Sequence, residues 1–503
     1  MKSIDLVYSY TLDVGFPTML RRFGQPSSLL IALLVCFLLC LPTPGWAQGG
    51  AGGGGAGGGG GGAGGGGAGG GGNNNGGGGG ASGVRIDATG TLRLMRANPV
   101  VTMARLRAAK QTLPQHLARP SKLRKVSLNR LEAAVAEKLA KGETPSPEMI
   151  TLAGMTRLEY VFFYPESGDI VLAGPAEGFG QDSTGRIVGV ETGKPTLLLE
   201  DLIVALRAYG PKNNDTDYIG VSIDPTQEGL AKMQKTLRNL GSSIQGAGGV
   251  QTIVNSLRTS LGPNTVTIDG VPAGTHFAHI LTEADYRMKL IGIGLEQPPI
   301  PMRSYVARLT SSMASSNALV RWFFVPDYSA IATSEDGLSM KMVGQGVKLV
   351  GEDEVVSGDG SRKVSGRPAN LASRGFTTEF TKKFRAISEN SRVFSQLRNL
   401  VDLTIAAAFI QDRDLYGKSG FDLGVLGSED KLPVQVLPAP KKVETAINAV
   451  MKGSRLITPI GGGVTIEAAK ALKKENLQSD SSIQRVQESV GLDSIPAAQW
   501  WWD

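Results

Sequence analysis

The chain has 503 residues, 41% hydrophobic and 19% charged, with a formal net charge of +7 at pH 7. Residues 49–83 hold 26 of its 68 glycines, and the glycine content of the rest is ordinary, which excludes a collagen-like or silk-like protein. The remainder is long enough for two or three domains with a sizeable core. The composition therefore predicts a globular protein behind a glycine-rich, low-complexity leader.

An export signal is predicted at residues 1–47. Its apolar stretch, Leu29–Leu41, is too short to span a bilayer but suits the core of a signal peptide. Gly45-Trp46-Ala47 places small residues where cleavage after Ala47 requires them. A start at Met19 instead of Met1 gives a more usual signal length, and a membrane anchor is the alternative interpretation. We therefore expect an exported protein in the periplasm, the cell envelope or the extracellular space.

The two cysteines, Cys36 and Cys40, both lie inside this predicted signal. Cleavage leaves a cysteine-free mature chain, which excludes disulfides, thiol catalysis and zinc sites built on cysteine. No later apolar run approaches the length of a membrane span, so no transmembrane segment is expected after cleavage.

Residues 48–83 are predicted to form a disordered poly-Gly linker, because such a chain has almost no side chains to bury. The linker is either a tether for the folded body or a low-complexity expansion without function. The segment 84–145 follows as a basic helical segment. Between residues 84 and 142 it carries 13 Lys and Arg against three Asp and Glu.

One helix of the basic segment is predicted from a stripe of leucine and valine between Leu128 and Leu139. Ser127 is placed to cap its start and Gly142 to end it. The excess charge indicates either an anionic polymer or membrane face as partner, or a solvated basic surface. The segment 84–142 has no aromatic residue for base stacking, so no nucleic-acid partner is expected.

The rest of the chain predicts an α+β (mixed α/β) fold with two subdomains, 146–297 and 298–460, that meet at a proline-rich joint. Strands alternate with amphipathic helices, and the segment 397–410 is apolar enough to be a helix buried on all sides. Residues 461–503 are predicted to be a polar C-terminal tail. Its Trp500-Trp501-Trp502 either folds back onto the body or binds a glycan, a partner or a membrane interface.

The strongest candidate for chemistry is the cluster around His276 and His279. On a helix these two imidazoles share a face with Glu283, which could hold a divalent metal, and Asp285 follows closely as a further candidate catalytic group. Histidines without a metal are the alternative. Asp285, Arg287 and Lys289 form an alternating run of charges that could line a polar cleft or stay at the surface as partially paired charges.

A second candidate metal site lies at Asp412 and Asp414. The two carboxylates have the spacing of the first half of a calcium loop, but Leu423 occupies the position of the last acidic ligand. An ordinary turn at the end of a helix is the alternative. No cofactor is predicted, apart from a divalent metal at one of these two places.

Several long phrases resemble a family of secreted planctomycete proteins that is described as a domain of unknown function. The resemblance covers roughly residues 125–460 and implies an export signal and a bacterial envelope or extracellular setting. It assigns no activity, ligand or catalytic residue. The phrases are Asp169-Ile-Val-Leu-Ala-Gly-Pro-Ala-Glu-Gly178, Asp201-Leu-Ile-Val-Ala-Leu-Arg207, Ser222-Ile-Asp-Pro-Thr-Gln-Glu-Gly229 and Ala284-Asp-Tyr-Arg-Met-Lys289.

The sequence names no biochemical activity. It favours a non-catalytic secreted or cell-envelope protein that binds an envelope protein or an anionic polymer. The alternative is an extracellular hydrolase or metal-dependent enzyme with a site near His276, His279 and Glu283. The sequence leaves the oligomeric state open.

Overall fold

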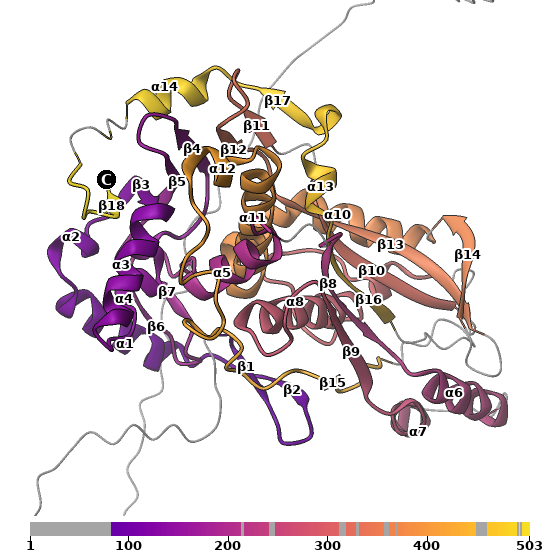
Figure 1. The fold of residues 1–503 in the computed structure, drawn as a ribbon. Helices are drawn as coiled ribbons and strands as arrows, with labels where there is room; N and C mark the ends of the chain where they lie inside the picture. The colour runs from indigo at the N-terminus through magenta and orange to yellow at the C-terminus, as the bar shows by residue number, and fades with distance from the viewer. Residues whose placement is uncertain are drawn as a thin grey trace, which may run out of the picture. The chain divides into compact units, whose positions relative to one another are not determined.

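In the computed structural model the described residues belong to one compact unit (Figure 1). The predicted signal peptide and the predicted linker as far as residue 81 lie outside them. The described residues are 82–212, 216–240, 247–310, 318–327, 331–356, 362–368, 370–448, 460–489, 492 and 495–503.

The fold is mixed α/β, as predicted, and its larger sheet has nine strands in the order β1-β2-β15-β9-β8-β16-β10-β13-β14. Strand β16 runs parallel to β10, and β15 runs parallel to β2, while the other neighbours are antiparallel. The strands are β1 (Val84–Ile86), β2 (Thr91–Leu94), β8 (Ile219–Asp224), β9 (Asn264–Asp269), β10 (Ala318–Pro326), β13 (Val347–Val356), β14 (Arg362–Pro368), β15 (Lys442–Val443) and β16 (Ile460–Ile466).

A second sheet has seven strands in the order β17-β11-β12-β4-β5-β3-β18, and β6 and β7 form a separate hairpin. Strands β4 and β5 follow one another in the chain and pair antiparallel. The strands are β3 (Ser121–Ser127), β4 (Tyr160–Tyr164), β5 (Asp169–Ala176), β6 (Phe179–Gln181), β7 (Ile187–Gly189), β11 (Ile331–Thr333), β12 (Met340–Met342), β17 (Leu477–Ser479) and β18 (Trp501–Trp502).

Helices pack on these sheets and on one another. Helix α8 contacts β8, β16 and β10, helix α10 contacts β13, and helix α11 contacts α5, α8 and α10. The helices are α1 (Pro99–Thr112), α2 (Gln115–Ala118), α3 (Leu128–Ala140), α4 (Pro147–Ile150), α5 (Leu199–Ala208), α6 (Gln227–Leu240), α7 (Ala247–Leu261), α8 (His276–Gly292), α9 (Tyr305–Arg308), α10 (Leu371–Asn390), α11 (Arg392–Asp412), α12 (Leu415–Ser419), α13 (Ala468–Ala471) and α14 (Ser482–Glu488), with 3-10 turns at Leu152–Gly154 and Lys474–Asn476.

The aromatic centre of the core lies between β10 and α10. Phe376, Phe380 and Phe384 recur at helical spacing on α10 and are fully buried. Phe380 and Phe384 meet the ring of Phe324 edge-on, at centroid separations of 5.6 and 6.2 Å. Edge-to-face contacts of this kind add to the burial of apolar area, so this stripe fixes α10 against the sheet.

Helix α11 is buried on nearly all sides, as its apolar sequence predicts. By length and composition it could cross a membrane, and it alone among the described helices passes that test. However, 94% of its most apolar window is buried inside the protein. Its apolar surface is therefore explained by the core of this fold.

The basic segment 84–145 is less helical than predicted. Ser127 caps α3 by accepting a hydrogen bond from the backbone N–H of Arg130, and Gly142 follows the helix with a φ of +73°, so both helix ends are confirmed. The same segment, however, also supplies β1, β2 and β3. Strand β1 pairs with β2, while β2 and β3 pair with strands from distant parts of the chain. It is therefore an integral part of both sheets.

The predicted boundary at 298 is not a boundary between compact units. Strand β10 follows residue 298 in the chain and pairs with β16. The other neighbour of β16 is β8, which precedes residue 298. In the second sheet β12 likewise pairs with β4. Because each large sheet combines strands from both sides of residue 298, the two predicted subdomains share one core.

The prediction of a loose polar tail at 461–503 is wrong. Strand β16 lies inside the nine-stranded sheet, and β18 pairs with β3 at the edge of the other. Trp500 and Trp502 are buried, and Trp501 stacks between His116 and the guanidinium of Arg124. The three indoles therefore fold back onto the body.

Candidate functional site

The predicted cluster of His276, His279 and Glu283 lies on α8, where all three side chains are buried. Thr275 caps this helix by accepting a hydrogen bond from the backbone N–H of Ala278. The three residues lie on one helix, but each side chain has a different set of partners.

His276 pairs with a carboxylate of α5. Its Nδ1 lies 2.9 Å from both carboxylate oxygens of Asp201, and its side chain is 1% exposed. Its Nε2 lies 3.4 Å from the side-chain nitrogen of Gln396 on α11. The imidazole therefore ties together three helices that meet in the core.

His279 points to other partners. Its Nε2 donates to the backbone carbonyl of Pro438 at 2.8 Å, and its Nδ1 lies 3.3 Å from the hydroxyl of Ser82. Burial lowers the pKa of His279, which favours a neutral ring that donates at Nε2 and accepts at Nδ1. Ser82 belongs to the predicted linker at 48–83, yet it is fully buried, so the folded body begins by residue 82.

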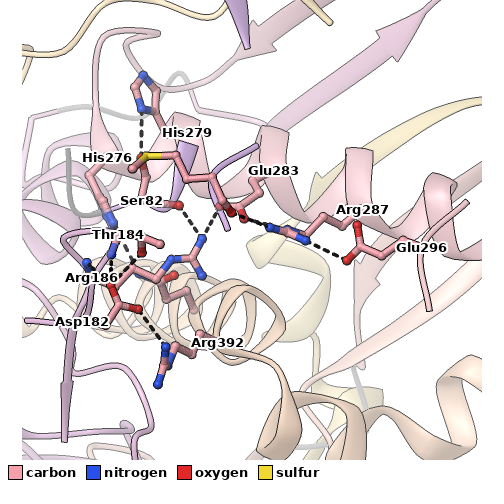
Figure 2. A network of polar contacts seen from close by, with 12 residues as sticks. Ser82, Asp182, Thr184, Arg186, His276, His279, Glu283, Arg287, Glu296 and Arg392 are labelled. Carbon is pink, nitrogen blue, oxygen red and sulfur yellow. Dashed lines mark hydrogen bonds and ion pairs between the residues drawn. The ribbon is translucent and has the colours of Figure 1, made fainter. Parts of the chain in front are cut away.

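Glu283 is held by two arginines (Figure 2). Its Oε2 accepts a hydrogen bond from Arg186, and its Oε1 accepts one from Arg287 at 2.8 Å. Because the two histidines bind elsewhere, the three residues do not converge on a point where a metal could sit. No group of three or more His, Cys, Asp or Glu residues suited to a metal ion occurs among the residues that the structure describes.

The other candidate ligands also have protein partners. Asp285 is fully buried and accepts a hydrogen bond from Lys289 at 2.6 Å, so it forms an internal ion pair and lines no cleft. Asp414 caps α12 through the backbone N–H of Gly417, and Asp412 lies 3.4 Å from Arg413. The turn at the end of α11 is therefore a helix-capping turn.

Arg186 and Arg287, the two arginines that bind Glu283, line a cavity of about 390 Å³, which we call the arginine cavity. Arg186, Arg287, Arg392 and Lys194 line it, against the two carboxylates of Asp182 and Glu389. Its remaining lining residues are Gly83, Met95, Ala97, Thr184, Thr192, Gly193, Pro195, Ser388, Asn390, Ser391 and Val393.

One wall of the arginine cavity is the turn between β6 and β7. Asp182 is buried there and accepts hydrogen bonds from the backbone N–H groups of Thr184, at 2.7 Å, and of Arg186, at 3.1 Å. Its other carboxylate oxygen accepts one from Arg392 at 2.9 Å. A single aspartate therefore shapes the turn and fixes a cation of α11 against it.

A second wall is the loop that follows β7. The carboxylate of Glu177, which is 4% exposed, accepts hydrogen bonds from the backbone N–H groups of Glu191 and Thr192, at 2.7 and 3.1 Å. This contact presents Lys194 to the cavity. Among the described residues the ammonium of Lys194 has no carboxylate partner, unlike the arginines beside it.

The third wall is the start of α11. Ser391 is the N-cap of this helix, and its side chain accepts no hydrogen bond from the first turn. The first N–H groups of any helix lack partners inside the helix and carry its partial positive charge. Ser391 and Arg392 line the cavity, but so do Ser388, Glu389 and Asn390 at the carboxyl end of α10, whose partial negative charge opposes that of the start of α11.

Arg186 is the most buried of the four cations. Its side chain is 6% exposed and donates to Glu283 and to the backbone carbonyl of Ser82, but its Nε has no hydrogen-bond partner among the described residues. Burial lowers the pKa of Arg186 against the opposing effect of Glu283. The guanidinium is therefore a buried cation whose unpartnered Nε is enclosed by protein.

Two hollows of 640 and 590 Å³ also occur in the described part of the chain, one beside Arg85 and Lys441 and one beside Arg207. Arg85 and Lys441 are exposed, and Arg207 is paired with Glu429. Neither hollow is lined by more than two cationic side chains, so the arginine cavity is the better candidate site.

The sequence indicated only part of this site. Arg287 was marked as a residue that could line a polar cleft, and it does line the cavity. Arg186, Arg392 and Lys194 were missed, because they come from segments that meet only in the folded chain. The one local signal was Asp182 before Gly185, a pattern typical of turns that hold backbone N–H groups.

Comparison with known proteins assigns no activity. A family model described as a protein of unknown function (DUF1598) matches residues 221–305, which run from β8 through α8 to α9. No curated protein and no solved structure matches the chain. The matched segment contains Glu283 and Arg287. The part of the chain that is similar to this family therefore supports one side of the arginine cavity.

Proposed function

We propose that this is a non-catalytic, exported binding protein that recognises an anionic group of its ligand in the arginine cavity. The observation that carries the proposal is the lining of the cavity, where four cationic side chains face two carboxylates and the ammonium of Lys194 has no carboxylate partner among the described residues. An anion placed there would pair with this ammonium.

The charge of the cavity supports an anionic ligand. Four cationic side chains line it against two carboxylates. A volume of about 390 Å³ suits a small molecule or one unit of a polymer. An anionic polymer therefore stays among the proposed ligands, with this cavity as the place where one of its charged groups binds.

The basic segment is a weaker candidate for that contact than its charge suggests. Of its 13 cations, six form ion pairs with carboxylates of the same chain. These pairs reduce the charge that the surface offers to a partner. The six are Arg93, Lys110, Arg124, Arg130, Lys138 and Lys141.

The enzyme alternative has less support. It needs His276, His279 and Glu283 at a place where substrate can reach them, but their side chains are buried and none of them lines the arginine cavity. A general base must reach the proton that it removes. Export to the periplasm, envelope or extracellular space is proposed from the leader sequence alone.

The proposal is tested by measuring the melting temperature of the full chain with small anions, namely phosphate, sulfate, glucose 6-phosphate and glucuronate, with glucose as the neutral control. Binding to the folded state raises the melting temperature, and the stabilisation grows with the logarithm of the ligand concentration above the Kd. We expect at least one anion to do so, glucose to have no effect, and added salt to weaken the response.

A matched pair of variants tests whether the anion binds in the arginine cavity. Lys194→Ala removes a cation that lines the cavity, and Lys122→Ala removes an exposed one outside it. We expect Lys194→Ala to weaken binding about tenfold, the value of one charge-assisted hydrogen bond, and Lys122→Ala to leave it unchanged. Equal losses in both variants, or no response to any anion, would contradict the proposal.

A further inference from the structure

Helix α1 rests on the protein by one face only. It contacts β6, where Gly180 lets it approach so closely that a Cβ on this glycine would lie 2.7 Å from the Cβ of Ala109 (Figure 1). Thr102 is buried on the same face and exchanges hydrogen bonds with Ser183, both at 3.1 Å. Leu106 and Ala109 are half-buried, and every other residue of the helix is exposed. The opposite face of α1 is therefore open.

This open face is apolar. Val100 is 74% exposed, Met103 is 54% exposed and Val101 is 39% exposed, and Ala104 lies one turn after Val100. Nowhere else in the described part of the chain do three large hydrophobic residues lie exposed within four positions. Single exposed apolar residues are ordinary, whereas a cluster of them indicates a surface that another partner covers.

The charge around this face has one sign. From Ala88 to Leu131 the chain carries ten Lys and Arg and no Asp or Glu. Arg107 lies two turns after Val100 on the same side of the helix, and it is exposed without a carboxylate partner among the described residues. Lys110 also lies on this side, where it pairs with Glu191. We call Val100, Val101, Met103 and Arg107 together the α1 surface.

The α1 surface is presented by a preformed helix. Asn98 caps this helix by accepting hydrogen bonds from the backbone N–H groups of Val100 and Val101, at 3.0 and 3.2 Å. Pro99 occupies the first helical position, where its fixed backbone angle suits a helix. Because the helix exists before any partner binds, docking requires no ordering of the backbone, which would otherwise oppose it.

From these observations we infer that the α1 surface docks the protein on a bilayer rich in anionic phospholipid. Such a bilayer offers phosphate oxygens to the cations and, directly beneath them, hydrocarbon to the valines and the methionine. A soluble anionic polymer pairs with the cations but leaves the apolar side chains in water. A symmetric dimer built on this surface brings like charges together. No residue of α1 lines the arginine cavity, so this inference goes beyond the proposed function.

The test is co-sedimentation of residues 48–503 with vesicles of phosphatidylcholine, either alone or with one-third phosphatidylglycerol. Residues 1–47 are left out because the apolar stretch Leu29–Leu41 would mask the contribution of α1, and the compact unit that contains α1 starts after them. We expect partition onto the anionic vesicles to be at least about tenfold stronger, and to weaken at high salt. Equal partition onto both kinds of vesicle, or onto neither, would overturn the inference.

A matched set of variants assigns the binding to α1. The double variant Val100→Gln/Met103→Gln replaces two exposed apolar side chains by a good helix former, so the melting temperature should not change, and we expect partition to fall at least about tenfold. Arg107→Gln should lower it about fivefold, the contribution of one cation near an anionic bilayer. The control is Leu371→Gln/Val436→Gln, at residues that are 62% and 63% exposed elsewhere, and it should bind like the wild type. Equal partition of the two double variants would overturn the inference.

Two further measurements test other occupants of the α1 surface. Dextran sulfate is a soluble polyanion without a hydrocarbon layer. If the wild type and Val100→Gln/Met103→Gln bind it equally well while neither binds the anionic vesicles, the partner is a polymer and the lipid inference is overturned. Sedimentation velocity over a range of protein concentrations tests for a second copy. A dimer of the wild type that Val100→Gln/Met103→Gln abolishes, again without vesicle binding, would also overturn it.

Discussion

The carboxylate of Glu283 on α8 is fully buried and accepts a hydrogen bond from Arg186, which lies 97 residues earlier in the chain. This contact joins the segment similar to a family of unknown function to the β6–β7 hairpin. The same carboxylate also holds Arg287 at 2.8 Å. One acidic side chain therefore positions two of the four cations of the arginine cavity.

Replacing this carboxylate should destabilise the fold. In Glu283→Gln both guanidiniums lose a charged partner in a buried setting, and breaking a buried pair costs about 3–5 kcal/mol. The matched control is Glu296→Gln, which removes the other, partly exposed partner of Arg287 and should cost at most about 1 kcal/mol. Urea unfolding of both variants checks this, and equal losses would contradict the role given to Glu283.

Asp402 on α11 predicts a pH-dependent stability. Burial raises its pKa to about 6, and Arg157 and Arg398, at 3.9 and 4.0 Å, only partly offset this effect. A carboxyl whose pKa is raised in the folded state stabilises that state below its unfolded pKa of 3.8. This contribution is lost as the pH rises through about 6.

The variant Asp402→Asn isolates this group. Relative to the wild type, its free energy of unfolding should increase between pH 4 and 7 by up to about 3 kcal/mol, the equivalent of about two pKa units. Urea unfolding at four pH values measures the difference. A difference that is constant over this range would show that Asp402 keeps its ordinary pKa in the folded protein.

Gly462 in β16 should tolerate no side chain. Its φ is +123°, and a Cβ at this position would lie 1.9 Å from the backbone carbonyl oxygen of Trp322 on the neighbouring strand. We expect Gly462→Ala to cost at least about 4 kcal/mol or to prevent folding. Gly142→Ala is the control, because Gly142 also has a positive φ but nothing within 4 Å, so about 1–2 kcal/mol of backbone strain is expected.

The C-terminal strand should be a structural element of the second sheet. Trp502 is 4% exposed, and next to it Asp503 accepts two hydrogen bonds from the buried Arg124, at 2.8 and 3.1 Å. Trp502→Ala should lower the free energy of unfolding by about 3–5 kcal/mol. Val436→Ala, at a residue that is 63% exposed, should change it by less than about 0.5 kcal/mol. An unchanged free energy of unfolding in Trp502→Ala would mean that β18 does not pair with β3 in solution.

Local elements of this fold could be predicted because their signals are local. Ser127 and Gly142 mark both ends of α3, and the phenylalanine stripe of α10 fits one helix face. Strand β16 was missed because Gly461, Gly462 and Gly463 have low strand propensity. Glycine is required at these positions because neighbouring atoms lie very close. A Cβ on Gly461 would meet Asp224, and one on Gly463 would meet the carbonyl of Val221.

The candidate site could likewise be predicted from the sequence only where its residues are close together in the chain. The histidine cluster stood out because its residues are close in sequence, yet His276 and His279 hold core segments together. Arg186 and Arg392 carry no local pattern and meet only through Asp182. Sequence spacing therefore located the helix beside the cavity, while the cavity itself depends on contacts between distant segments.

The most direct measurement is an experimental structure of the full chain with a saturating concentration of a small anion that raises its melting temperature. The account predicts this anion in the arginine cavity, within hydrogen-bond distance of Lys194 Nζ. A ligand bound elsewhere while this cavity holds no anion would contradict it.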